Sequence, residues 1–212
     1  MIARPVHNLI GARVDGLNIL SNEDSSVASQ LLALLQRYDL LIIPNQQLTD
    51  EQQIRFSEQL GPLETTKPGS TGAGTKLVTL SNLDTDGYPV EPSHRQNLIG
   101  RANQLWHADS SFKPIPAKLS ILSARQIPDL GGETQFVNMR SVYTALPKHE
   151  QEKCDGYIAI HDFAHSRKTV DPHLMTDEER AAVPPVRQPL TIDHDEHRGR
   201  SLYIGSHVSH IE

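Results

Sequence analysis

Apolar residues recur at helical spacing in two segments near the N-terminus. Ser25-Ser26 precede VASQLLALLQRY, whose apolar positions fall on one face, so the pattern predicts a capped amphipathic helix. Residues 40–44, LLIIP, form a short apolar run closed by proline and indicate a buried strand. In LTDEQQIRFSEQLG, Thr49 and Gln52 have capping-box spacing, and Gly61 is placed for a left-handed C-cap, so we expect a second helix.

The pattern changes from residue 67, where glycine, proline, serine and aspartate predict loops as far as about residue 100, around one strand, KLVTLSN. Beyond residue 117, period-two patterns predict strands, with a short helix in MRSVYTALP and a helical turn capped by Thr176 in TDEERAAVPP. The predicted strands are AKLSILSARQIP, GGETQFVNM, YIAIHDFAHS and a final pair, PLTIDH and RSLYIGSH, joined by the turn DEHRG. Helices followed by short strands predict an α+β fold with a barrel or sandwich core.

Composition narrows the class of protein. The 212 residues suit one domain, 1–212, and 37% hydrophobic residues can build a core. A net charge of −6 without a basic stripe argues against a nucleic-acid partner. The single cysteine, Cys154, excludes an intramolecular disulfide and fits a reducing compartment. With no signal-peptide pattern and no apolar run of membrane-spanning length, we expect a cytoplasmic protein and no membrane partner.

The stretch NQLWHADSSF, residues 103–112, carries the first candidate for chemistry. In an extended segment the side chains of His107 and Asp109 point to the same side and can face one metal ion. One histidine and one aspartate, with a second histidine from elsewhere, form the facial triad of non-haem Fe(II) oxygenases. In a chain with 11 histidines, however, chance alone gives about 0.7 His-x-Asp pairs, so the bare motif decides nothing.

The motifs around this pair resemble the taurine dioxygenase and 2,4-dichlorophenoxyacetate dioxygenase family of Fe(II)- and 2-oxoglutarate-dependent oxygenases. The resemblance covers nearly the whole chain and is strongest to the phenoxyacetate branch. It rests on NQLWHADSSF together with GGETQF, NMRSVYTALP, LLIIPNQQLTDEQQIRFSEQLGPLE, AAVPPVRQPL and RSLYIGSHVSHIE. It implies a double-stranded β-helix (jelly-roll) core with flanking helices, apparently truncated at the C-terminus.

The resemblance also implies roles for single residues. His107 and Asp109 match the first two iron ligands, and Thr134 matches the threonine that binds the distal carboxylate of 2-oxoglutarate. Asn103 and His207 match positions that line the substrate pocket, with His207 as a candidate for an anionic head group. The alternatives are an ordinary strand residue for Thr134 and a turn-forming asparagine at position 103.

Lys67 lies in the loop before the site and could offer a cation to an acidic substrate, unless it is a solvated loop lysine.

The third iron ligand is the main departure from the family pattern. The distal histidine, and the arginine that pairs with 2-oxoglutarate, would lie beyond Glu212, so a truncated chain is the favoured explanation. A substitute ligand could come only from the histidines that follow Asp109: His161, His165, His194, His197, His207 and His210. We expect His161 and His165 in the surface or second layer, and His194 and His197 in a solvated turn. His210 is a weaker candidate for the substrate head group.

The function expected from these observations is hydroxylation of a small anionic molecule, such as the aryloxyalkanoate 2,4-dichlorophenoxyacetate. The reaction would use Fe(II), 2-oxoglutarate and O2 and release succinate and CO2, and a homo-oligomer is possible. Two alternatives stay open: a non-catalytic jelly-roll fragment without the third ligand, and a zinc hydrolase, for which no HExxH motif exists.

Overall fold

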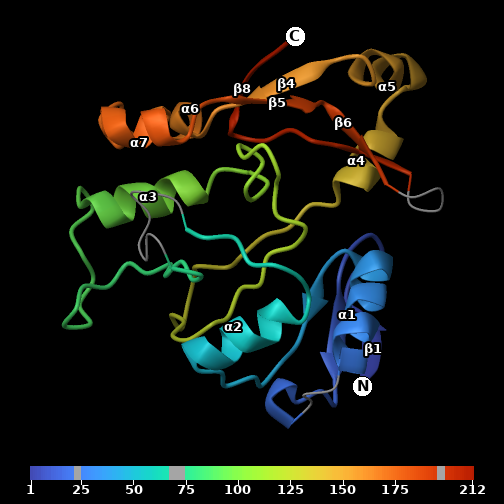
Figure 1. Ribbon diagram of the computed structural model, residues 1–212, viewed down its shortest axis with the longest axis vertical. Coiled ribbons are helices and arrows are strands. Elements are labelled where there is room, and N and C mark those ends of the chain that lie inside the picture. The colour runs from blue at the N-terminus through green and yellow to red at the C-terminus, as the bar shows by residue number, and fades with distance from the viewer. Residues whose placement is uncertain (22–24, 67–74, 195–198) are drawn as a thin grey trace. The chain divides into compact units, whose positions relative to one another are not determined.

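The computed structural model describes residues 1–21, 25–66, 75–194 and 199–212 (Figure 1). Within this part the chain forms two compact units, one made of Met1–Glu64 and Ile121–Asn138, the other of Thr65–Ser120 and Met139–Glu212. Because residues 121–138 return to the first unit, no single cut in the sequence separates the units. The expectation of one domain spanning 1–212 stays a prediction.

The first unit contains a three-stranded sheet and two helices. The strand order is β1-β2-β3, with β1 antiparallel and β3 parallel to β2; the strands are Ile2–Pro5, Ala12–Asp15 and Leu41–Ile42. A 3-10 turn, Ile19–Ser21, precedes α1, Ser25–Tyr38, and α2 is Asp50–Glu58. The buried core draws on the sheet, both helices and the segments between them: Val14, Leu17, Ile19, Val27, Leu31, Leu48 and Phe56.

The predicted start of α2 is confirmed, whereas α1 begins at Ser25, so the two serines expected to precede it lie inside it. The Thr49 side chain accepts a hydrogen bond from the backbone N–H of Gln52, and the Gln52 side chain accepts one from the backbone N–H of Thr49. The predicted end is wrong, because α2 stops two residues before Leu60 and its C-cap is Gln59 in a right-handed conformation. Gly61 has φ of 150°, outside the left-handed helical region that a C-cap glycine adopts.

Several predicted strands are wrong. The run at 40–44 forms a strand of only two residues, and Ile42 is 44% exposed rather than buried. KLVTLSN, AKLSILSARQIP and GGETQFVNM contain no strand in the described residues. The alternating pattern gives these segments a suitable apolar face, but a strand also needs a neighbour for its backbone N–H and C=O groups.

Two side chains anchor residues 121–138 within the first unit. Arg125 donates to Asp50 at 3.2 Å and to Gln53 at 2.8 Å, both on α2. Asn138 donates to the carbonyl of Leu9 at 2.7 Å.

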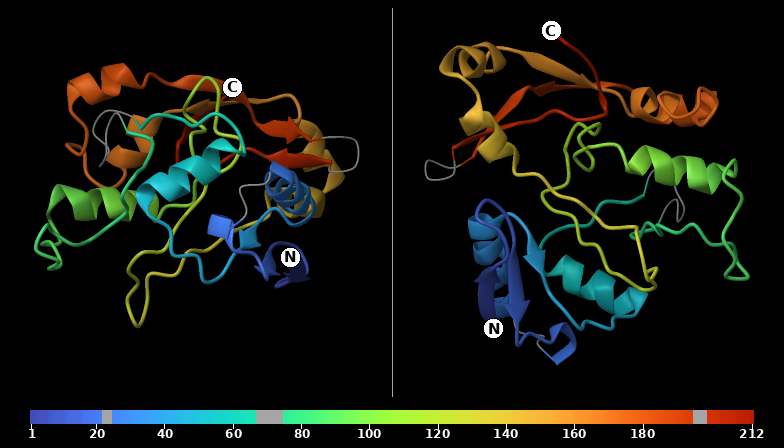
Figure 2. Two further views of the ribbon diagram at one scale, coloured as in Figure 1. Left: turned by 60° about the horizontal axis from the view of Figure 1, so that its bottom comes forward. Right: turned by 180° about the vertical axis from the view of Figure 1, so that it is seen from behind.

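The second unit contains an antiparallel sheet, a strand pair and a set of short helices (Figures 1 and 2). The sheet order is β5-β4-β8, where β4 is Ile158–His161, β5 is Val186–Pro189 and β8 is Val208–Ile211. The pair is β6, Thr191–Asp193, with β7, Arg200–Leu202. The helices are α3 Arg95–Asn103, α4 Met139–Ala145, α5 Lys148–Cys154, α6 Phe163–Lys168 and α7 Asp177–Ala182.

The final strand pair, the helix in MRSVYTALP and the Thr176-capped turn are confirmed. The turn DEHRG falls largely outside the described residues. The strand predicted over YIAIHDFAHS is only half right, because the strand ends at His161 and Asp162 caps α6, accepting from the Ala164 N–H at 2.8 Å. A capping aspartate directly before Phe163 was the signal for this helix.

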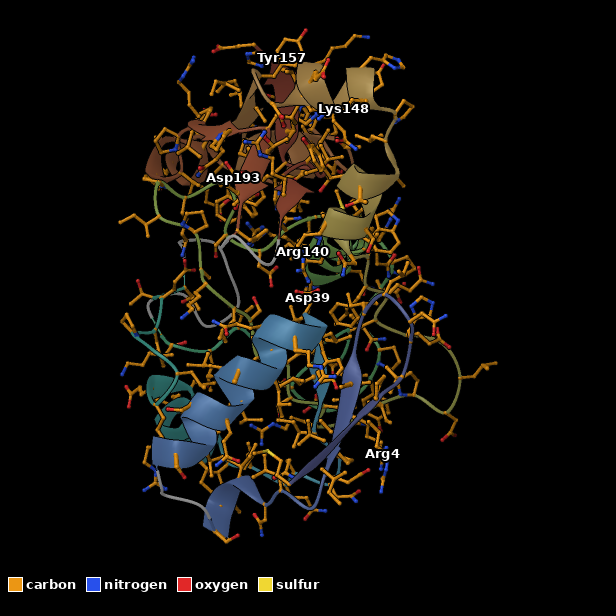
Figure 3. All side chains as sticks on the ribbon, turned by 90° about the vertical axis from the view of Figure 1, so that its right-hand side faces the viewer. Arg4, Asp39, Arg140, Lys148, Tyr157 and Asp193 are labelled. Carbon is orange, nitrogen blue, oxygen red and sulfur yellow. The ribbon has the colours of Figure 1, made fainter. Side chains whose placement is uncertain are left out.

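A polar network joins α4 to the β6–β7 pair. The hydroxyl of Tyr143 donates to Asp155 at 2.8 Å, and Arg200 forms ion pairs with Asp155 and Asp193; Asp193 is labelled in Figure 3. Burial alone raises the pKa of Asp155, but the Tyr143 hydrogen bond and the Arg200 charge outweigh it, and the pKa is lowered. The network therefore favours the folded state only while Asp155 is ionised.

We predict that Tyr143→Phe lowers the free energy of unfolding by about 1.5–3 kcal/mol at pH 7, the usual contribution of a hydrogen bond to a charged group. Because folding lowers the pKa of Asp155, this contribution is present above the unfolded pKa of about 4 and is lost as pH falls through the folded pKa. Urea denaturation at pH 7 and near pH 3 measures both values. Tyr88→Phe, at an exposed tyrosine, is the control. An equal loss at both pH values would contradict the role of Asp155.

Candidate metal centre

The loop after α3 carries the His-x-Asp pair and is held by close backbone contacts. The N–H of Ser206 donates to the carbonyl of Trp106 at 2.8 Å. A Cβ atom at Gly205 would lie 3.0 Å from the Cα of His107, so glycine is what allows the two backbones to approach. Ser110, with φ of 57°, turns the chain directly after Asp109. The segment is thus a loop fixed from outside, and not the strand-like segment that the sequence suggested.

The two candidate ligands nevertheless meet, as their spacing predicts. Nε2 of His107 lies 3.2 Å from Oδ1 of Asp109, and Nδ1 of His107 lies 2.6 Å from the carbonyl oxygen of Leu105. A carbonyl only accepts, so Nδ1 carries the proton in this bond and Nε2 of the neutral ring presents its lone pair. When Nε2 is protonated as well, it donates to Asp109, and this hydrogen bond raises the pKa of His107 and lowers that of Asp109 to about 2.

This donor pair fits a divalent metal ion. The backbone carbonyl that orients a ring nitrogen away from the metal is a common supporting partner of histidine ligands. Ser120 donates to Oδ2 of Asp109 at 2.7 Å, which holds the carboxylate while Oδ1 faces His107. One imidazole nitrogen and one carboxylate oxygen suit Fe(II) and Mn(II).

A third ligand is not found in the part of the chain that the structure describes. No group of three or more histidine, cysteine, aspartate or glutamate side chains there could hold a metal ion. His207 comes nearest to His107, with ring centroids 5.7 Å apart, but its Nδ1 lies 2.9 Å from the hydroxyl of Ser166. His197 lies outside the described residues.

The remaining histidines are distributed as follows. His165 is exposed, as expected, and His210 is exposed beside Ser209. His194 is half-buried and contacts Ser201 at 2.9 Å, rather than standing in solvent. His161 is 1% exposed, so a surface position is wrong; its ring packs against Tyr203, and burial lowers its pKa.

The other predicted site residues fall in different places. Asn103 ends α3 and is half-buried, and its Oδ1 accepts from Arg167 at 2.9 Å. His207 is buried beside His107, in the same unit. Thr134 is exposed and belongs to the first unit, so its role in binding 2-oxoglutarate stays a prediction. Lys67 lies outside the described residues.

Sequence reasoning missed four residues that shape this region. Ser120, Ser166 and Arg167 act through contacts with residues 11 to 64 positions away, and no local pattern distinguishes them. Gly205 carried a usable signal, since a glycine inside a strand-like pattern often marks a close approach of another backbone.

We predict that Ser120→Ala weakens binding of Mn(II) about tenfold, the lower range for loss of a residue that supports a metal ligand. The variant frees Oδ2 of Asp109, so the carboxylate is no longer held for the metal. Electron paramagnetic resonance of free aqueous Mn(II) measures the affinity. Ser123→Ala, three residues further along, should leave it unchanged, and equal affinities for all three proteins would refute the role of Ser120.

The chain is similar to known proteins over nearly its whole length. The model of the family described as "Taurine catabolism dioxygenase TauD, TfdA family" matches residues 3–212. The chain is 34% identical over 217 residues to the alpha-ketoglutarate-dependent 2,4-dichlorophenoxyacetate dioxygenase of Cupriavidus pinatubonensis, covering 100% of this chain and 76% of that protein. It is 32% identical to the (S)-phenoxypropionate/alpha-ketoglutarate-dioxygenase of Sphingobium herbicidovorans, covering 98% of this chain and 71% of that protein.

Solved structures show the same relationship. The structure of AAD-2 with Mn(II) and N-oxalylglycine has a TM-score of 0.87 at 34% identity, covering 100% of this chain and 73% of that one. A putative alpha-ketoglutarate-dependent 2,4-D dioxygenase from Burkholderia xenovorans has a TM-score of 0.75 at 28% identity, covering 99% and 71%. These coverages are consistent with the expected truncation.

The predicted jelly-roll fold with flanking helices is confirmed by these neighbours. Fe(II), 2-oxoglutarate and O2 are the cofactor and cosubstrates implied by the relatives and by the structure with Mn(II) and N-oxalylglycine. The relatives' class, oxidoreductases acting on small molecules, excludes the zinc hydrolase. The chain belongs to the TauD, TfdA family of 2-oxoglutarate-dependent dioxygenases.

Proposed function

We propose that His107 and Asp109 are two of the three Fe(II) ligands of this dioxygenase and that its substrate is an aryloxyalkanoate. The observation that carries the first part is the orientation of His107, whose Nδ1 is committed to the Leu105 carbonyl while Nε2 faces Asp109. Such an arrangement presents a nitrogen and an oxygen donor at one point without further rearrangement.

When bound, Fe(II) with 2-oxoglutarate and O2 supplies the oxidant that hydroxylates a C–H bond, with succinate and CO2 as the other products. The residues of this chain orient and shield the reactants. Leu105 fixes the ring of His107, and Ser120 fixes the carboxylate of Asp109. By resemblance, Thr134 binds the distal carboxylate of 2-oxoglutarate. Lys67, in the loop that precedes the site in the sequence, offers a cation to the substrate.

Aromatic side chains around His207 support an aryl substrate. Phe112 and Phe163 are buried with ring centroids 4.6 Å apart, and both pack against the ring of His207. Rings of this kind pack well against an aromatic ligand. Relatives named for 2,4-dichlorophenoxyacetate and (S)-phenoxypropionate act on compounds of this class.

The reaction of such a substrate follows from where the hydroxyl enters. Hydroxylation of the carbon between the ether oxygen and the carboxylate gives a hemiacetal. Its C–O bond to the aryl ether breaks as the hydroxyl loses a proton, and the phenol oxygen takes up that proton. The products are a phenol and an oxo acid, and no further oxidant is consumed.

A second candidate substrate class is an alkyl sulfate. The chain is 27% identical over 210 residues to an alkylsulfatase of Acinetobacter baylyi. An alkyl sulfate shares the anionic head group but lacks the aromatic ring, so the aromatic cluster favours the aryloxyalkanoate.

The location of the protein in the cell stays a prediction. Among the helices that the structure describes, none is long and apolar enough to cross a bilayer.

Anaerobic addition of Fe(II) and then 2-oxoglutarate should give a visible metal-to-ligand charge-transfer band. Admitting O2 with 2,4-dichlorophenoxyacetate should then release 2,4-dichlorophenol and succinate in equal amounts. We predict that Asp109→Ala abolishes the band because it removes one of the iron ligands, whereas Asp177→Ala, at an exposed residue on α7, retains it.

The outcomes separate the possible errors. Absence of the band from the unaltered protein would indicate the non-catalytic alternative. A band without phenol release would refute the aryloxyalkanoate substrate, and a full band in Asp109→Ala would refute the ligand assignment.

A further inference from the structure

Arg167, on α6, is a buried cation whose charge is not balanced within the described residues. Arg167 is 7% exposed. No carboxylate of the described residues forms an ion pair with its guanidinium. Nη2 donates to Oδ1 of Asn103 at 2.9 Å, and the guanidinium carbon lies 4.2 Å from the centre of the Phe163 ring. Nη1 is buried and has no hydrogen-bond partner there.

Burying an unpaired charge is costly, and buried charges in proteins are normally paired or hydrogen-bonded. An amide oxygen and a ring face offset part of this cost, but neither carries a negative charge. Burial lowers the pKa of Arg167 to about 10, which still leaves the guanidinium protonated at neutral pH. The side chain therefore keeps its charge and retains a donor for an anion.

The position of Arg167 connects this charge to the candidate metal centre. Its guanidinium lies against Phe163, the ring of Phe163 packs at 5.5 Å from that of His207, and His207 lies 5.7 Å from His107. Asn103, its hydrogen-bond partner, ends the helix that leads into the His107 loop. All five residues belong to the second unit.

We propose that Arg167 binds the carboxylate of the aryloxyalkanoate substrate, a role that rests on the proposed function and names the group that recognises its anionic end. Nη1 donates to the carboxylate while Nη2 remains on Asn103, and the aromatic cluster contacts the aryl ring. Holding both ends places the carbon between the ether oxygen and the carboxylate.

His207 is less suited to this task. The Ser166 hydroxyl donates to the Phe163 carbonyl at 2.9 Å, so it can accept the Nδ1 proton of His207. Nδ1 of His207 is thus engaged by Ser166, whereas Nη1 of Arg167 has no hydrogen-bond partner among the described residues and a guanidinium has only donors. We therefore assign the anionic end to Arg167 and the packing of the aryl ring to His207.

The experiment compares an acid with an uncharged analogue of the same shape. Isothermal titration calorimetry, with Mn(II) in place of Fe(II) and with 2-oxoglutarate present, measures binding of 2,4-dichlorophenoxyacetate and of 2,4-dichlorophenoxyethanol without turnover. In Arg167→Met the acid should bind about 10–100-fold more weakly, the usual loss for a charge-assisted hydrogen bond. The alcohol should bind as it does to the unaltered protein.

The control is Arg101→Met, which removes an exposed arginine from α3 and should leave both affinities unchanged. Equal affinity of Arg167→Met for the acid would overturn the proposal. An equal loss for acid and alcohol would also overturn it, because it would show that Arg167 only supports the fold. A selective loss of 2-oxoglutarate affinity would assign the guanidinium to the cosubstrate instead.

Arg167→Lys covers the case in which the methionine variant does not fold. Lysine keeps the charge but not the planar fork, so it should bind the acid more weakly than arginine does while binding the alcohol equally. Unchanged affinity for the acid, or a loss shared by both ligands, would count against the proposal.

Taurine and an alkyl sulfate, titrated in the same way, separate this proposal from the substrate class. If taurine or the alkyl sulfate binds and 2,4-dichlorophenoxyacetate does not, the aryloxyalkanoate assignment fails. Loss of binding of that ligand in Arg167→Met would still support the anion site. If the unaltered protein shows the charge-transfer band but binds none of the acids, the anion site is refuted while the iron centre stands.

Discussion

The close approach of two backbones is the constraint on which the candidate metal centre depends. Gly205 lies against the backbone at His107, and the N–H of Ser206 is bonded to the Trp106 carbonyl. A loop on its own would leave His107 and Asp109 free to sample many arrangements. The hydrogen bond to Ser206, just before β8, fixes the backbone of the loop. The residue after Ser206 is His207, which is thereby placed beside His107. The iron ligands and the aromatic cluster are therefore positioned by the same contact.

The features of the fold that could be predicted from sequence are those decided within a few residues. The capping boxes at Thr49 and Thr176 depend on a hydroxyl and a side chain three positions later, and both formed. The missed helix α3 has little amphipathic pattern, and its N-cap is a histidine, which is not among the usual capping residues. The strands predicted within 117–139 do not form, although their local pattern is typical of strands. Their pattern was correct for a sheet face, but pairing depends on a partner that local sequence does not specify.

In the candidate metal centre, too, features set by neighbouring residues were predictable and features set by distant residues were not. The spacing of His107 and Asp109 was enough to predict that their side chains meet, because that is a property of neighbouring residues. The residues that make the pair suitable for a metal were not predictable, since Ser120 approaches from 11 positions away and acts through one hydroxyl. The family resemblance supplied roles for Thr134 and Asn103 that no pattern contains. The arginine beside Asn103 was visible only once burial and partners were known.

Arg167 shows how a local conflict can mark a functional region. Two other arginines of the second unit pair with carboxylates: Arg200 with Asp155 and Asp193, and Arg95 with Glu179. A chain selected only for stability would replace a buried, unbalanced guanidinium with an apolar side chain, because such replacements are often neutral or stabilising. Its retention beside Phe163 and Asn103 is therefore better explained by binding than by folding. A ligand that brings a negative charge would remove the conflict and gain affinity, because the cost of desolvating the cation has already been met in the folded protein.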